Sequence, residues 1–211
     1  MRPLVLASTS PRRRRLLRQL GVAFSVRAPE ADERPLPGET PPGHVRRLAL
    51  EKARAVARAL PPDCGARWVL GADTVIALDV EILGKPRGPR DAVRMLARLA
   101  GRSHEVLTGV ALVPVAGGRA RAAVVRSRVT MKGLDGEAIR RYVATGEPLD
   151  KAGAYAVQGR GRRLVAAVSG SLTNVVGLPL ERLAELLAAC GLAVLPAGRG
   201  RRHRAAPSAR C

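Results

Sequence analysis

Short apolar runs alternate along the chain with stretches whose apolar residues are spaced three and four apart. The short runs, which are bounded by glycine, proline or charged residues, predict strands. The amphipathic stretches between them predict helices. Strands are expected at 4–7, at 24–26, within 67–78, on both sides of the Gly117–Gly118 turn and near 164–168.

Helix starts and ends are marked by capping residues. Ser10 is a suitable N-cap and Pro11 a suitable first residue for the first helix, because proline at that position loses no hydrogen bond. Further helices are predicted from Thr40–Pro41 to about Leu60, between Pro89 and Gly101, over 135–145 and over about 180–189.

The run "RWVLGADTVIAL" is expected to form two strands, because Gly71–Thr74 interrupts it, and "DVEILGKP" is expected to turn back as a hairpin. The mixture of strands and helices predicts an α/β fold. We expect one domain over residues 1–195, followed by a basic, disordered tail over 196–211.

Net charge and aromatic content narrow the possible ligands of this chain. The chain has 211 residues, a formal net charge of +20 and only 2% aromatic residues. A strongly basic protein attracts polyanions, but few aromatics argue against stacking single-stranded nucleic acid. Weak, non-specific nucleic-acid binding by the arginine-rich tail remains an expectation.

The cysteines and the length of the apolar runs indicate in which cellular compartment the protein is expected. An odd number of cysteines without a CxxC pair favours a reducing compartment over a disulfide scaffold. The N-terminal apolar run is too short for a signal peptide, and no stretch is long enough to span a membrane. We therefore expect a cytoplasmic protein.

Several familiar catalytic motifs are absent from the sequence. It contains no GxxxxGK[ST] phosphate loop and no HExxH zinc motif, and it has only three histidines. A histidine-based zinc site or a Ser–His–Asp triad is therefore not expected. The remaining candidates are polar residues at the ends of strands and helices, where α/β proteins form their sites.

The stretch "LASTSPRRRRLL" places arginines at the start of a helix, where the helix dipole opposes positive charge. The hydroxyls of Ser8 and Ser10, together with Arg12 and Arg13, would suit an anion such as phosphate. The alternative is an ordinary helix cap followed by a solvated basic turn. Neither alternative is excluded by these residues alone.

Two acids and two lysines are further candidates. Asp73 follows apolar residues in "LGADTV" and needs a partner there, either as a metal ligand or general base or as a cap. Glu33 ends the acidic run "EADE", where a solvated acid is the simpler interpretation. Lys52 and Lys85 stand out because the chain uses arginine for nearly every other cation.

Seven segments together resemble the Maf family of nucleoside triphosphate pyrophosphatases. They occur in the family's order and extend from Leu4 to about Cys190. The segments are "LASTSPRRRRLL", "EADE", "EKA", "LGADTVIALDVEILGKP", "LAGRSHEVLTGV", "EPLDKAGAYAVQG" and "GSLTNVVGLPL".

The resemblance implies a twisted mixed sheet, related to that of inosine triphosphatases, which spans two lobes with a central cleft. It also implies a homodimer that hydrolyses a nucleoside triphosphate to the monophosphate and pyrophosphate with Mg²⁺ or Mn²⁺. The family is associated with septum formation and arrest of cell division. A non-catalytic basic protein that binds nucleic acid or regulates division is the alternative.

Roles for individual residues are also implied by the resemblance. Asp73 would accept the proton of the attacking water and, with Glu33, hold the metal. The phosphates would be bound by Ser8, Ser10, Arg13, Lys52 and Lys85, the two lysines also taking part in catalysis.

Three positions separate the family's base preferences, and here they are Arg12, Thr74 and Gln158. They resemble the branch that prefers dTTP and UTP over 7-methyl-GTP. Two departures from the family pattern are Val80, at a hairpin turn that usually has glycine, and Leu172, in place of an aromatic.

Overall fold

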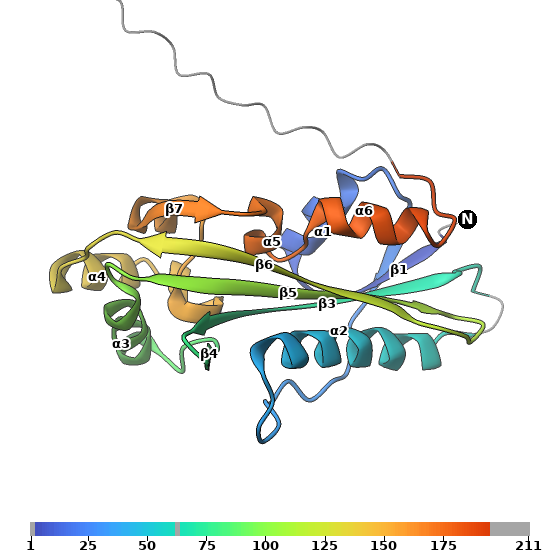
Figure 1. Cartoon of the computed structure of the whole chain (residues 1–211), viewed down its shortest axis with the longest axis horizontal. Coiled ribbons are helices and arrows are strands. Elements are labelled where there is room, and N and C mark those ends of the chain that lie inside the picture. Colours follow the sequence, from blue (N-terminus) through green and yellow to red (C-terminus); the bar gives the residue numbers. More distant parts are fainter. Residues whose placement is uncertain (1–2, 62–63, 195–211) are drawn as a thin grey trace, which may run out of the picture.

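A seven-stranded mixed sheet forms the centre of the molecule (Figure 1). The computed structural model describes residues 3–61 and 64–194, so the expected tail at 196–211 lies outside the described residues. The strand order is β2-β1-β3-β5-β6-β7, with β4 paired to β3. The strands are β1 (Leu4–Ala7), β2 (Phe24–Arg27), β3 (Trp68–Leu78), β4 (Glu81–Leu83), β5 (Ser103–Pro114), β6 (Arg121–Met131) and β7 (Val165–Ser169).

Helices cover both faces of this sheet, which confirms the predicted α/β class. In Figure 1, α2 lies along one face while α1 and α6 lie on the other, and α3 and α4 pack at one end. The helices are α1 (Pro11–Arg18), α2 (Pro41–Arg58), α3 (Pro89–Leu99), α4 (Gly136–Val143), α5 (Leu172–Val176) and α6 (Leu180–Ala188). Three 3₁₀ turns lie at Glu147–Asp150, Ala152–Ala154 and Gly159–Leu164.

Three helices begin where the sequence predicted, and each has a side-chain cap. The side chains of Ser10, Thr40 and Asp135 accept hydrogen bonds from the backbone N–H three residues later. Pro11 and Pro41 then begin α1 and α2, since a first-turn proline sacrifices no intrahelical bond. The short helix α5 was not predicted from the sequence.

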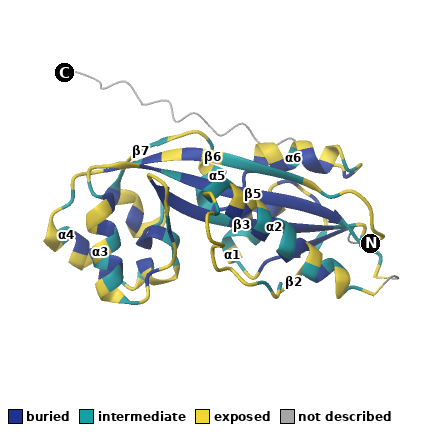
Figure 2. Cartoon of the chain, turned by 60° about the horizontal axis from the view of Figure 1, so that its bottom comes forward, coloured by how far each residue is buried: buried dark blue, intermediate teal, exposed yellow. Residues whose placement is uncertain are grey.

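The apolar core is divided between the two ends of the sheet. One cluster packs α1 and α6 against β1 and β3, and another packs α3 and α4 against the far ends of β3, β5 and β6. Two smaller clusters lie under α2. Figure 2 shows buried positions concentrated along the strands, with exposed positions on the outer helix faces. The long strands thus connect two lobes.

The predicted break at Gly71–Thr74 is wrong, because β3 is one continuous strand. Gly71 and Gly109 are required by packing and not by a turn. A Cβ at these positions would lie 2.0 Å from the Ala49 carbonyl oxygen and 2.1 Å from that of Val45. The two glycines therefore let the backbone of α2 lie directly on the sheet.

The β3–β4 hairpin explains how Val80 is accommodated. Asp79 takes the positive φ of the turn, 57°, which aspartate tolerates better than a branched residue does. Val80 is 88% exposed and Leu172 is 53% exposed. Neither departure from the family pattern therefore disturbs the core.

We expect Gly109→Ala to lower the free energy of unfolding by about 1–3 kcal/mol, because the added methyl overlaps the α2 backbone. Urea denaturation measures the change. Gly133→Ala is the matched control, since a Cβ there meets no atom within 4 Å. Equal stability of the two variants would contradict the close approach of α2.

Candidate functional site

A cleft of about 430 Å³ lies between the two lobes, where the edge of β3 is open. On that edge β1 pairs with β3 only as far as Ala7 opposite Gly71, and β4 pairs only from Ile76 onward. Among the strands of the described chain, none covers Ala72–Val75 on this edge. Side chains on both faces of β3 therefore reach the cleft.

Residues predicted from distant parts of the sequence come together in this cleft. Contributions come from the β1–α1 turn, the loop before α2, α2 itself, β3, the β4–α3 loop and the 150–158 segment. Every predicted site residue lines it: Ser8, Ser10, Arg12, Arg13, Glu33, Lys52, Asp73, Thr74, Lys85 and Gln158.

Lys52 lies between two carboxylates at the base of the cleft. Its Nζ is 2.6 Å from Asp73 Oδ1 and 2.6 Å from Glu33 Oε1. The lysine occupies a sheet-facing position of α2 and is 5% exposed, while Asp73 is 7% exposed. Since a buried charge is costly without a partner, the two acids and the lysine stabilise one another.

Asp73 was expected just beyond the end of a strand, and that placement is wrong. It lies inside β3, opposite Gly109 of β5, on the face covered by α2. The expectation that this acid needs a partner is confirmed by its hydrogen bond with Lys52. No hydrogen bond to its other oxygen, Oδ2, is formed by the residues described.

Glu33 is more exposed than Asp73, and its electrostatics differ accordingly. Partial burial acts to raise its pKa, but the hydrogen bond and charge of Lys52, with Lys85 and Arg13 nearby, lower the pKa overall. Glu33 is therefore an ionised carboxylate at neutral pH. Its position depends on a loop without regular secondary structure.

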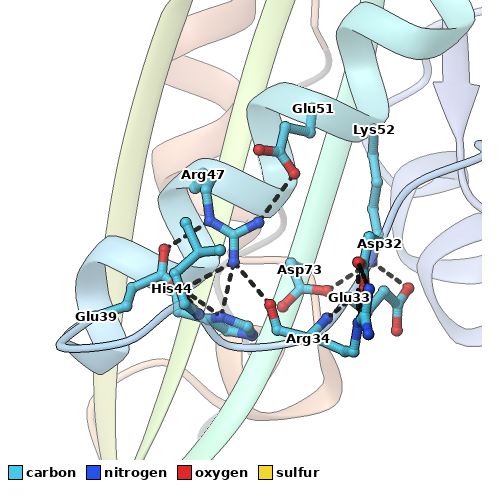
Figure 3. A network of polar contacts seen from close by, with 10 residues as sticks. Asp32, Glu33, Arg34, Glu39, His44, Arg47, Glu51, Lys52 and Asp73 are labelled. Atoms are coloured by element: carbon cyan, nitrogen blue, oxygen red, sulfur yellow. Dashed lines mark hydrogen bonds and ion pairs between the residues drawn. The ribbon is translucent and has the colours of Figure 1, made fainter.

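That loop is held to α2 by a polar network, shown in Figure 3. Arg47 donates to both oxygens of Glu39, at 2.7 and 2.8 Å, and to the carbonyl of Arg34 at 3.1 Å. His44 Nδ1 is 2.9 Å from Glu39 Oε2. Because Arg34 follows Glu33, this network fixes the chain next to the carboxylate that contacts Lys52.

The start of α1 forms the opposite wall of the cleft. The Ser8 hydroxyl accepts from the N–H of Ser10, and the Ser10 hydroxyl caps the helix. Arg12 and Arg13 line the cleft, whereas Arg14 and Arg15 do not. Arg12 also lies 3.7 Å from Asp150 across the cleft, an exposed pair of small energetic value.

Arg13 is held firmly in its place. Its Nε donates to the Gly177 carbonyl at 2.9 Å and its Nη2 to the Thr74 hydroxyl at 3.1 Å. Burial lowers the pKa of its guanidinium, while the carboxylates of Asp73 and Glu33 act to raise it. Arginine nevertheless remains charged at any physiological pH.

Lys85 and Gln158 are exposed and reach the cleft from the β4–α3 loop and the 150–158 segment. Cleft residues that sequence reasoning gave no role include Lys151 and Tyr155. Both lie in "EPLDKAGAYAVQG", one of the segments that resemble the family, but neither was assigned a role there. Thr108, which supports Thr74 from β5, likewise had none.

Fold and cleft together define an α/β protein with more cations than acids lining its site. The Maf-like protein family model matches residues 3–190, and this chain belongs to that family. Among its relatives, a dTTP/UTP pyrophosphatase of Myxococcus xanthus is 54% identical over 189 residues, covering 90% of this chain and 93% of that protein.

A second relative and one solved structure are also similar to this chain. A dTTP/UTP pyrophosphatase of Symbiobacterium thermophilum is 50% identical over 200 residues, covering 95% of this chain and all of that protein (100%). A crystal structure of a nucleoside-triphosphatase / dITP/XTP pyrophosphatase from Mycobacterium abscessus covers 89% of this chain and 93% of that chain, with a TM-score of 0.43 and 19% identity. With a TM-score and an identity this low, the structural similarity supports no conclusion about this chain.

The Glu39 network predicts a specific loss of stability in acid. Contacts with Arg47, opposed by desolvation and aided by His44, lower the pKa of Glu39 from 4.5 to about 2. The unfolded chain protonates this group first, so its contribution is full above about pH 4.5 and is lost as the pH falls toward 2.

Glu39→Gln should therefore be less stable than wild type at pH 6, and the difference should shrink at pH 3. Urea denaturation at the two pH values measures it. The control is Glu30→Gln, an acid of the same loop whose carboxylate forms no ion pair with the residues described. A difference for Glu39→Gln that is the same at both pH values would refute the role of this carboxylate.

Proposed function

We propose that this chain hydrolyses dTTP and UTP to the nucleoside monophosphate and pyrophosphate. The observation that carries this proposal is the Glu33–Lys52–Asp73 cluster, which faces the helix start that holds Arg13 across one cleft. One wall can bind phosphate oxygens, and the base of the cleft can activate water. The names of the close relatives support the same reaction and substrates.

Hydrolysis joins a water oxygen to the α-phosphorus and breaks its bond to the oxygen that bridges to the β-phosphate. Pyrophosphate leaves, and the proton of the water passes to Asp73. The Oδ2 atom of Asp73 can accept this proton because only Oδ1 is engaged by Lys52. The lysine keeps the carboxylate oriented and partly balances the charge of the reacting phosphate.

Cations on both sides of the cleft bind the chain of phosphates. Arg13, Lys52 and Lys85 provide positive charge, and the hydroxyls of Ser8 and Ser10 with the first N–H groups of α1 provide donors. Phosphate binding would explain why arginines are crowded at the start of α1. A triphosphate offsets the unfavourable interaction between these arginines and the helix dipole.

The residues present also fit a divalent cation. Glu33 and Asp73 each place an oxygen 2.6 Å from the same Nζ, so the two carboxylates lie close together. Mg²⁺ is typically held by one or two carboxylates, with substrate phosphates and water completing its shell. No third His, Cys, Asp or Glu side chain joins them to form a larger cluster in the described part of the chain, so substrate phosphates and water would have to complete the shell.

We therefore assign Glu33 and Asp73 as the residues that would hold Mg²⁺ or Mn²⁺. The bound cation would neutralise phosphate charge as it develops. A homodimer, a cytoplasmic location and a link to septum formation are further parts of the proposal, and they are supported by the resemblance to the family. No helix within the described residues is both long and apolar enough to cross a membrane.

Asp73→Asn should lower kcat/KM for dTTP by roughly 10²–10⁴-fold, the range typical of losing a general base. Pyrophosphate release from dTTP and UTP with Mg²⁺ measures it. Asp79→Asn, the same change in the exposed hairpin, is the control. Release that survives Asp73→Asn would exclude Asp73 as the base but leave the reaction intact, whereas no release from folded wild type would exclude the reaction.

The base preference can be tested separately. A 7-methylguanine is cationic, and the nearby Arg12 and the neutral Gln158 disfavour it. We expect kcat/KM for dTTP to exceed that for 7-methyl-GTP by about tenfold or more, a difference of 1.4 kcal/mol or more. Gln158→Glu should narrow this ratio, whereas Gln19→Glu, on the exposed end of α1, should not. Comparable turnover of both nucleotides by wild type would contradict the assignment.

A further inference from the structure

Four groups form a continuous chain of hydrogen bonds beneath the cleft. Arg13 Nη2 donates to the Thr74 hydroxyl at 3.1 Å, and the Thr74 and Thr108 hydroxyl oxygens are 2.9 Å apart. Thr108 donates to the backbone carbonyl of Asn174 at 3.0 Å. Thr74 and Thr108 are directly opposite each other on β3 and β5, and Thr108 is fully buried.

The direction of every bond in this chain follows from counting protons. A carbonyl oxygen can only accept, a guanidinium can only donate, and each hydroxyl has one proton. Thr108 gives its proton to Asn174, so the proton between the two hydroxyls must come from Thr74. Thr74 therefore accepts from Arg13 and has no proton left to donate.

This proton count limits what Thr74 can do for a nucleotide. The carbonyl oxygens of a thymine or uracil need hydrogen-bond donors, and the Thr74 hydroxyl cannot be one while its proton is given to Thr108. One lone pair of the Thr74 oxygen remains, so the hydroxyl can still accept from the N3–H of such a base. By contrast, Gln158 is exposed and its amide carries both donors and an acceptor. Arg12, also in the cleft, can donate as well.

The same contacts make Thr74 a support for Arg13. With Nε on the Gly177 carbonyl and one Nη2 proton on Thr74, the guanidinium is held at two points and keeps three N–H groups for an anion. Gly177 lies against both partners, since a Cβ there would be 3.5 Å from the Thr74 hydroxyl and 3.7 Å from Arg13 Nε. A fixed guanidinium binds phosphate with less loss of side-chain entropy.

We propose that Thr74 is a positioning residue: its hydroxyl, oriented by Thr108, holds Arg13 for the phosphates. The proposal rests on the proposed function for the identity of the phosphates. This role is additional to the base preference that the family resemblance associates with Thr74.

Inorganic tripolyphosphate is a probe for this role, because it has phosphates and no base. Its binding with Mg²⁺ is measured by calorimetry. Thr74→Val keeps the shape of the side chain and removes the hydroxyl. We expect it to weaken tripolyphosphate binding by roughly tenfold, as for a lost hydrogen bond to a charged group.

Three further variants sharpen the test. Thr74→Ser keeps the hydroxyl and should restore tripolyphosphate binding to within about twofold of wild type. Thr108→Val, which does not line the cleft, should weaken binding in the same direction but less, by roughly threefold. In an Arg13→Met background, Thr74→Val should have no further effect on tripolyphosphate, since coupled residues are not additive. Thermal unfolding identifies any variant that fails to fold.

The outcomes are distinct. Unchanged tripolyphosphate binding in Thr74→Val would overturn the proposal, as would weakened binding in Thr74→Ser or additive losses in the Arg13→Met background. Wild type that does not bind tripolyphosphate would overturn it too. If wild type binds tripolyphosphate and the variants weaken binding as expected, but no nucleotide is hydrolysed, the proposed function fails while the role of Thr74 stands.

Discussion

The direct contact between α2 and the sheet is the constraint on which the site depends. Gly71 and Gly109 leave room for the helix backbone, so the sheet-facing positions of α2 lie close to the strands. Lys52 occupies such a position and reaches Asp73 over a short distance. A larger residue at either glycine would move the helix, and the lysine would no longer meet its partner.

The buried lysine in turn makes Glu33 part of the site. Lys52 contacts both carboxylates at 2.6 Å, and leaving a buried charge without a partner would cost several kcal/mol. Asp73 is held by the sheet and Glu33 by a loop that Arg47 anchors to α2. Asp73 is thus positioned by the backbone of the sheet, whereas Glu33 is positioned by side-chain contacts of its loop.

Much of the fold was predictable because its signals are local. Caps at Ser10, Thr40 and Asp135 act over three residues, and the structure begins helices at each. Gly71 was misread because a glycine in an apolar run signals either a break or a close approach, and only the position of α2 distinguishes them. All predicted site residues share one cleft, although Asp73 was expected outside the strand.

The sequence by itself determined where the main helices begin, the α/β class, the family and the residue types at the cleft. The tertiary structure decided which atoms meet: Lys52 with two acids, Arg13 with Gly177, 164 positions away, and the proton order through Thr74 and Thr108. Capping and periodicity involve neighbours in the chain, so the sequence records them. Hydrogen-bond direction depends on partners that only packing brings together.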